Sequence, residues 1–178
     1  MKATGIVRRI DDLGRIVIPK EIRRTMRLRE GEALEIFTGD TGEVVFKKYS
    51  PVEEYSETAG QVCEALWKAA GLPAVVCDRD RVVAAAGPVR REVQGRTITP
   101  ELDCRMGDRK PFRATDGVPF ALTPEKPELQ VLCMSPILSD GDVTGCVAFV
   151  GGEAVPQSGE AETKLVSAGA NLLGRQGS

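Results

Sequence analysis

The composition of this chain of 178 residues changes near residue 50 and divides it into two parts, which must be stabilised in different ways. Residues 1–50 contain short runs of β-branched residues, but no cysteine and no histidine. A segment of about fifty residues can hardly bury enough apolar surface to be stable alone. It also lacks the residues for a disulfide or for a histidine- or cysteine-ligated metal that could stabilise it. We therefore expect residues 1–50 to fold as a dimer whose core is shared between two chains.

Basic residues are concentrated in the same segment. Residues 1–29 hold nine lysine or arginine side chains against three acidic ones, a net charge of +6. Residues 51–178 hold 13 basic and 18 acidic side chains, a net charge of −5. Segregation of charge between two parts of a chain is typical of a nucleic-acid-binding segment joined to a second module.

The chain has no histidine, and this excludes several kinds of site. Ser-His-Asp catalysis, Cys-His catalysis and histidine-ligated zinc all need an imidazole. The cysteines are odd in number and widely spaced, which fits neither a zinc knuckle nor a disulfide framework. We expect most of them to be buried reduced thiols, and we expect no enzymatic activity, no metal and no cofactor. They are Cys63, Cys77, Cys104, Cys133 and Cys146.

No run of residues approaches the roughly 18 consecutive apolar residues of a membrane span. The first residues lead into a charged segment without the apolar stretch of a signal peptide. We expect a cytoplasmic protein that does not contact a membrane.

Two strands and a short helix are predicted near the N-terminus. Alternation over residues 4–10 predicts a strand, residues 11–14 a turn, and residues 15–18 a second strand. Pro19 ends that strand and suits the first position of a helix over residues 20–27.

A hairpin is predicted next, with strands over residues 34–38 and 44–49 around a glycine-containing loop. The apolar side chains of the segment are expected in its core. They are Ile16, Val17, Ile18, Ile22 and Met26.

Ser50, Pro51 and Glu53 are typical of a helix start, and the helix is predicted to reach residue 71. Its broad apolar face either packs against the sheet of its own domain or contacts a second subunit. The residues of this face are Tyr55, Ala59, Val62, Leu66 and Ala69, widened by Cys63, Trp67 and Ala70.

Four β-rich runs and a final helix complete the chain. An Asp-Gly pair between the last two runs is a strong hairpin signal. Two helices that bracket an antiparallel sheet predict an α+β domain over residues 51–178. The runs cover residues 74–77, 82–85, 130–138 and 143–150, and the helix covers residues 158–174 with Leu165, Ala168, Gly169 and Leu172 on one face.

Residues 87–128 show no clear periodicity. They are either a ligand-covering segment with short helices or a solvated insertion, and the second is the simpler interpretation.

The run TGIVRRIDDLGRIVIPKEIRR at residues 4–24 closely resembles the N-terminal DNA-binding domain of the AbrB family of transition-state regulators. The resemblance continues through residues 34–37 and 44–49. It implies that residues 1–50 of two chains form a swapped-hairpin β-barrel that binds double-stranded DNA. This agrees with the dimer expected from size.

The same resemblance identifies candidate DNA contacts. Guanidinium groups bind phosphates bidentately and read the O6 and N7 atoms of guanine. Each basic side chain could instead be a solvated charge, but a dimer doubles them into one surface whose DNA binding depends on salt. Arg8, Arg15, Arg23 and Arg24 match arginines that face DNA in the family, and Arg9 and Lys20 lie close to them.

Residues 51–178 resemble the GAF-like domain found in two-domain AbrB-type regulators of endospore-forming bacteria. That resemblance implies a role in sporulation. The domain either binds an unidentified small-molecule effector, for which no binding residue stands out, or assembles dimers into a homotetramer.

The main prediction is therefore a sequence-selective DNA-binding transcription regulator. One alternative is an AbrB-type antitoxin that regulates its own synthesis and neutralises a toxin, although the strand-rich second part argues against a toxin-wrapping tail. Another is a redox sensor that uses Cys77, Cys104 or Cys133.

Overall fold

The computed structural model describes residues 4–54, 56–152 and 158–176. The chain divides into two compact units, Met1–Tyr49 and Ser50–Ser178. None of the helices in the described residues is long and apolar enough to cross a bilayer.

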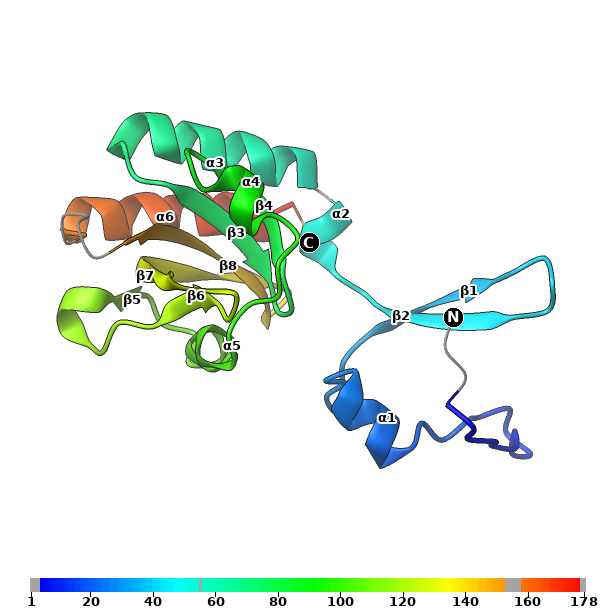
Figure 1. The fold of residues 1–178 in the computed structure, drawn as a ribbon. Coiled ribbons are helices and arrows are strands. Elements are labelled where there is room, and N and C mark those ends of the chain that lie inside the picture. Colours follow the sequence, from blue (N-terminus) through cyan, green and yellow to red (C-terminus); the bar gives the residue numbers. More distant parts are fainter. Residues whose placement is uncertain (1–3, 55, 153–157, 177–178) are drawn as a thin grey trace. The chain divides into compact units, whose positions relative to one another are not determined.

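The N-terminal unit contains one short helix and one hairpin (Figure 1). The helix is α1 (Lys20–Thr25), and the hairpin pairs β1 (Leu34–Thr38) with β2 (Val44–Lys48) in antiparallel register. The helix is shorter than predicted because Arg27 has a φ of 53°, a left-handed conformation that ends α-helices.

The strands predicted over residues 4–10 and 15–18 are not formed in this chain. The turn between them is present, since the Gly14 N–H donates to the carbonyl of Asp11 at 3.0 Å and the Asp11 N–H donates to the carbonyl of Arg15 at 3.1 Å. A strand needs a neighbouring strand to pair its backbone groups. Within the described residues, neither segment belongs to a sheet.

The described apolar side chains of the N-terminal unit are exposed or only half-buried. None of its described residues is buried, and Ile16, Val17 and Met26 expose 47 %, 72 % and 45 % of their surface. Ile18 and Ile22 are only half-buried. A single chain therefore does not bury the residues that we expected in the core, and their apolar surface is open to a partner.

The C-terminal unit is built on a fully antiparallel sheet, and the predicted α+β class is confirmed. The strand order is β4-β3-β8-β7-β5, and β6 also pairs with β7. All four predicted strands occur and extend beyond the predicted ends. The strands are β3 (Ala74–Asp78), β4 (Val82–Ala86), β5 (Phe112–Arg113), β6 (Ala121–Thr123), β7 (Lys126–Ser139) and β8 (Asp142–Gly151).

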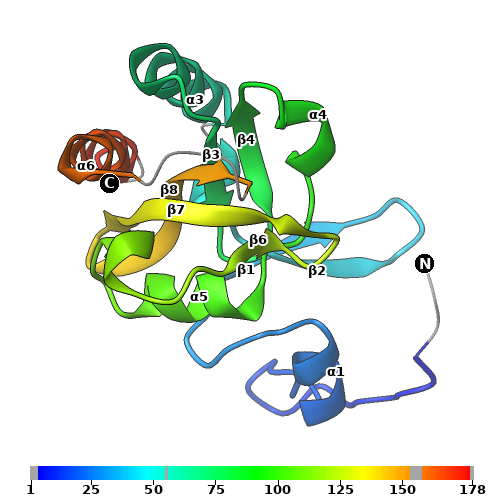
Figure 2. The same ribbon diagram turned by 60° about the vertical axis from the view of Figure 1, so that its left-hand side comes forward.

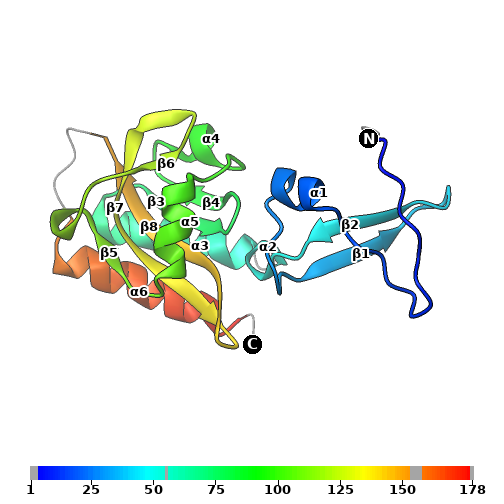
Figure 3. The ribbon, with the colours of Figure 1, turned by 90° about the horizontal axis from the view of Figure 1, so that it is seen from below.

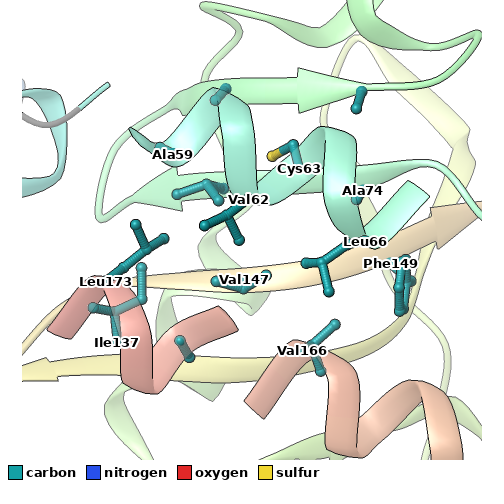
Figure 4. Packing of buried hydrophobic residues seen from close by; sticks show 14 of the residues in the cluster. Ala59, Val62, Cys63, Leu66, Ala74, Ile137, Val147, Phe149, Val166 and Leu173 are labelled. Atoms are coloured by element: carbon teal, nitrogen blue, oxygen red, sulfur yellow. The ribbon is translucent and has the colours of Figure 1, made fainter. Parts of the chain in front are cut away.

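Two long helices cover one face of this sheet (Figures 2 and 4). They are α3 (Ser56–Ala70), which follows the short α2 (Pro51–Glu54), and α6 (Glu160–Gly174). Val62 and Leu66 of α3 pack in one buried cluster with Phe149 of β8. The first predicted helix therefore packs against the sheet of its own domain. Ala69 is exposed, contrary to prediction, and Tyr55 lies outside the described residues.

The face of α6 that packs on the sheet differs from the predicted one. Gly169 is buried as predicted, but Leu172 of the predicted face is 51 % exposed, and Val166, Ala170 and Leu173 are buried instead. A side chain at Gly174 would place its Cβ 2.3 Å from the carbonyl oxygen of Leu138. Small residues therefore let the helix approach β7 closely, and this approach selects the buried face.

The prediction of a solvated insertion at residues 87–128 is wrong. The segment forms α4 (Arg90–Val93), α5 (Pro100–Gly107), a 3-10 turn η1 (Ala114–Asp116) and two short strands. It covers the second face of the sheet (Figure 3). Ile98, Leu102, Met106 and Leu122 are each at most 1 % exposed and pack against buried residues of β3 and β8. The elements were missed because they are too short to show periodicity.

Four of the five cysteines are buried free thiols, which confirms the prediction that most of them are buried, and Cys104 is exposed. Cys77 of β3 lies opposite Cys146 of β8. A hydrogen bond with Cys146 and burial raise the pKa of the Cys77 thiol. Burial also raises the pKa of Cys133, and it raises that of Cys63 to about 12. These thiols stay protonated near neutral pH, which opposes a redox sensor based on Cys77 or Cys133.

Ser50 directly precedes α2, as expected for a helix start, and it also binds the end of β3. Its hydroxyl donates to Asp78 Oδ2 at 3.0 Å. Asp78 Oδ1 accepts the N–H groups of Asp80 and Arg81, both at 2.7 Å. Asp78 is only 5 % exposed. This carboxylate therefore fastens the start of the C-terminal unit to the β3–β4 turn.

Replacing Asp78 with alanine is expected to lower the free energy of unfolding of the C-terminal unit by about 2 kcal/mol, because buried donors lose their acceptor. Chemical unfolding followed by the fluorescence of Trp67, the single tryptophan, would measure this. Asp142→Ala is the matched control, since Asp142 is exposed. Equal stability of the two variants would contradict the role assigned to Asp78.

Candidate nucleic-acid interface

The turn at residues 11–14 is organised by Asp11. Its Oδ1 accepts the N–H groups of Leu13 at 3.0 Å and Arg15 at 2.8 Å, and its Oδ2 accepts Arg15 Nε at 2.8 Å. Hydrogen bonds from the backbone and then the side chain of Arg15 hold the pKa of Asp11 below its usual value. The stabilisation from these bonds is present above the usual carboxyl pKa and is lost as the pH falls through the lowered value.

Asp11 therefore orients Arg15, one of the predicted DNA contacts. This role was not predicted from the sequence, although the spacing of four residues between Asp11 and Arg15 is a signal of such an ion pair. The Arg15 side chain remains 69 % exposed, so an external anion can still reach it.

Helix α1 brings three of the predicted residues together. The backbone of Pro19 begins the helix, and its carbonyl accepts the Arg23 N–H at 2.9 Å. Lys20 is three and four residues before Arg23 and Arg24, so it neighbours both of them on the helix surface, with Cβ atoms about 5–6 Å apart. All three are exposed, and their side chains form no hydrogen bond or ion pair with any described residue.

Two further contacts tie the segment that follows α1 to the hairpin. Lys48 Nζ of β2 donates to the carbonyl of Arg27 at 3.0 Å and lies 3.3 Å from Glu32 Oε1. Glu32 Oε2 in turn accepts the N–H of Arg29 at 2.7 Å. The sequence did not single out Lys48 or Glu32, because their roles depend on a contact between segments about twenty residues apart.

Arg8 and Arg9 lie before the turn and are exposed. The Nη1 of Arg8 donates to the carbonyl of Val7 at 3.1 Å. In the described part of the chain, neither residue has a hydrogen bond or ion pair to α1. The structure therefore groups Lys20, Arg23 and Arg24, but it does not join Arg8 or Arg9 to them. Lys2, counted among the basic residues, lies outside the described residues.

This arrangement is suited to an extended polyanion. Unpaired guanidinium groups donate several hydrogen bonds to phosphate oxygens or to a guanine edge. Within the described residues, no cluster of acidic or cysteine side chains could hold a metal ion in their place.

Comparison with known proteins separates the same two parts of the chain. The family model described as "Stage V sporulation protein T C-terminal, transcription factor" matches residues 54–177. A second model, "Antidote-toxin recognition MazE, bacterial antitoxin", matches residues 7–54.

Two relatives from Bacillus subtilis (strain 168) match different lengths of the chain. Stage V sporulation protein T is 41 % identical over 177 residues, which cover 99 % of this chain and 98 % of that protein. Transition state regulatory protein AbrB is 46 % identical over 71 residues, which cover 40 % of this chain and 72 % of that protein.

The C-terminal unit has structural relatives among GAF domains. The GAF-B domain of DevS from Mycobacterium smegmatis aligns with a TM-score of 0.52 at 16 % identity, covering 68 % of this chain and 91 % of that domain. The predicted GAF-like fold is therefore confirmed.

Proposed function

The chain belongs to the family of stage V sporulation protein T, a transcription factor family, and we propose that it binds operator DNA through its N-terminal unit to regulate sporulation genes. The observation that carries this proposal is the group formed by Lys20, Arg23 and Arg24. All three are exposed on one short helix and have no partner among the described residues.

The remaining candidates extend the basic surface. Arg15 beside Asp11, with Arg8 and Arg9 before the turn, supplies further cations for backbone phosphates. Phosphate contacts position a protein on DNA, whereas base contacts and DNA shape give selectivity. Few neutral polar side chains lie near these residues, so part of the selectivity is expected to come from DNA shape.

The test is binding of the full-length protein to genomic DNA fragments over a salt series. With several phosphates neutralised by each dimer, the logarithm of the binding constant should fall with that of the salt concentration with a slope steeper than about −5. Binding that is absent at low salt, or that does not depend on salt, would reject the proposal.

We propose that the N-terminal units of two chains share one core. The support is that none of the described residues of this unit is buried in one chain, although several apolar side chains are available. The segments predicted as strands over residues 4–10 and 15–18 would then find their pairing partners in the second chain.

Val17 provides a test of this dimer. Replacing it with threonine keeps the shape but adds a hydroxyl, which is harmless on a surface and costly in a dry interface. We expect Val17→Thr to raise the dissociation constant of the dimer by about tenfold, measured by analytical ultracentrifugation. Val118→Thr, the same change at a position of the C-terminal unit that is 77 % exposed, serves as the control. An unchanged constant for Val17→Thr would place Val17 outside the interface.

We further propose that the C-terminal unit joins two dimers into a tetramer. The support is the outward side of α6, where Leu172 is exposed and Leu165 only half-buried. Leu172→Ser should then leave a stable dimer in sedimentation experiments, whereas a tetramer of unchanged stability would oppose this role.

The antitoxin remains the second candidate, because the MazE model matches residues 7–54. The relative that covers nearly the whole chain is a sporulation protein, and the second unit is folded, so the regulator is the better proposal. Co-purification of a small toxin with the full-length chain would reverse this order.

As relatives of this chain regulate transcription, we place its activity in the cytoplasm, where bacterial DNA lies, and assign it no enzymatic reaction.

A further inference from the structure

The segment at residues 87–128 leaves little room for a ligand beneath it. Ile98, Leu102 and Met106 are each at most 1 % exposed and fill the space against the sheet. A cavity of about 460 Å³ that is open to solvent lies elsewhere, between α6 and the segment that contains β5 and η1. Its volume is within the range of small-molecule sites.

One side of this cavity is formed by β5 and η1. Arg113 lies at the end of β5, and its Nε and Nη2 both bind Asp116 Oδ2, at 2.9 and 2.8 Å. The ring of Phe112 supplies apolar surface beside them. Phe112 is held in turn by the ring of Phe120 at 4.9 Å and by the guanidinium of Arg105 at 5.4 Å.

The other side is a polar stripe of α6. Lys164, Ser167 and Asn171 follow one another at intervals of three and four residues, so they share one face of the helix. Lys164 Nζ binds Glu160 Oε1 at 2.7 Å, which uses one of its three N–H groups. The side chains of Ser167 and Asn171 have no hydrogen-bond partner among the described residues.

The charges of the lining are balanced. Each side contributes one cation and one carboxylate, Arg113 with Asp116 and Lys164 with Glu160. A dianion would meet two carboxylates, and a metal cation would meet two basic groups. A molecule that carries one ammonium and one carboxylate can bind groups of both signs.

We propose that this cavity binds a free α-amino acid with an apolar side chain. Its carboxylate would accept hydrogen bonds from Lys164 or Arg113, and its ammonium would donate to Glu160 or Asp116. Its side chain would lie against Phe112. The hydroxyl of Ser167 and the amide of Asn171 would orient the backbone groups. A regulatory role for this amino acid would rest on the proposed function in transcription. Its binding to the cavity does not depend on that function.

The experiment is a thermal unfolding screen of the full-length protein with each proteinogenic amino acid at about 10 mM, followed by calorimetric titration. An apolar amino acid should raise the melting temperature by a few degrees through mass action. The N-acetyl derivative and the methyl ester of the same amino acid each lack one charge, so neither should do so. A screen without a stabilising amino acid would overturn the proposal, and so would equal binding of the derivatives.

Variants locate the binding. Asn171→Ala should raise the dissociation constant of the amino acid found in the screen by about tenfold, which corresponds to the loss of one or two hydrogen bonds. Gln61→Ala, an exposed position on α3, is the control and should not change the affinity. Equal affinity of the Asn171→Ala variant would place the ligand elsewhere. DNA binding of the same preparation separates the two proposals, because salt-dependent DNA binding without an amino-acid ligand refutes only this one.

Discussion

Replacing Arg23 with alanine is expected to weaken DNA binding by about a hundredfold while leaving the fold intact. The side chain is exposed and unpaired among the described residues, so its removal costs little stability. A charged hydrogen bond contributes about 1.5 kcal/mol or more, and a dimer loses two of them. The sum of about 3 kcal/mol corresponds to a hundredfold change in the dissociation constant.

The matched control for Arg23→Ala is Arg91→Ala. Arg91 is also an exposed arginine, but it lies on α4 of the C-terminal unit. Both variants remove one charge from each chain, so a general electrostatic effect would weaken DNA binding by both equally. We expect fluorescence anisotropy to show the large loss only for Arg23→Ala, together with a shallower salt dependence. Equal affinities of the two variants would contradict the assignment of Arg23.

Replacing Gly145 with alanine is expected to destabilise the C-terminal unit by about 3–4 kcal/mol. Gly145 lies opposite Asp78, where β8 and β3 run side by side. A Cβ atom at this position would stand 2.1 Å from the carbonyl oxygen of Cys77. The oxygen belongs to the backbone of the central sheet and the position of the Cβ atom is fixed by the backbone of β8, so the added methyl group forces the strands apart. The shift would also disturb Asp78 and its bond to Ser50.

Gly60→Ala is the control for this substitution. Gly60 lies inside α3, and a Cβ atom there would meet nothing within 4 Å. Alanine is the better helix former, so this variant should gain about 0.5–1 kcal/mol. Urea unfolding followed by the fluorescence of Trp67 would compare the two variants. A Gly145→Ala variant as stable as the natural chain would show that β3 and β8 are not so closely spaced.

Much of the architecture could be predicted because its signals are local. β1 has the predicted bounds, and the Asp-Gly pair at residues 140–141 joins β7 to β8 as expected. The division near residue 50 follows from composition and helix-start residues. The basic residues of α1 were also predictable, since their spacing and the family motif are both contained in a few consecutive positions.

Other features depend on contacts that no local pattern records. The second layer over the sheet consists of elements too short for periodicity, and its residues are recognisable as core only once they pack on β3 and β8. The buried face of α6 was mispredicted because the predicted and the observed sets of residues both follow helical spacing, and the close approach of Gly174 to Leu138 is not visible in the sequence. The roles of Glu32, Lys48 and Asp78 likewise depend on partners distant in sequence.

The sequence by itself determined the family, the two-part organisation, the α+β class and the basic helix, because each follows from composition, turn chemistry or a motif of neighbouring residues. The tertiary structure alone decided which faces are buried and how the carboxylates of Asp11 and Asp78 are used. It also decided that the segment at residues 87–128 is closely packed on the sheet, while an open cavity lies beside α6. The physical reason is that burial and close approach are properties of pairs of surfaces, and such a pair exists only when the chain is folded.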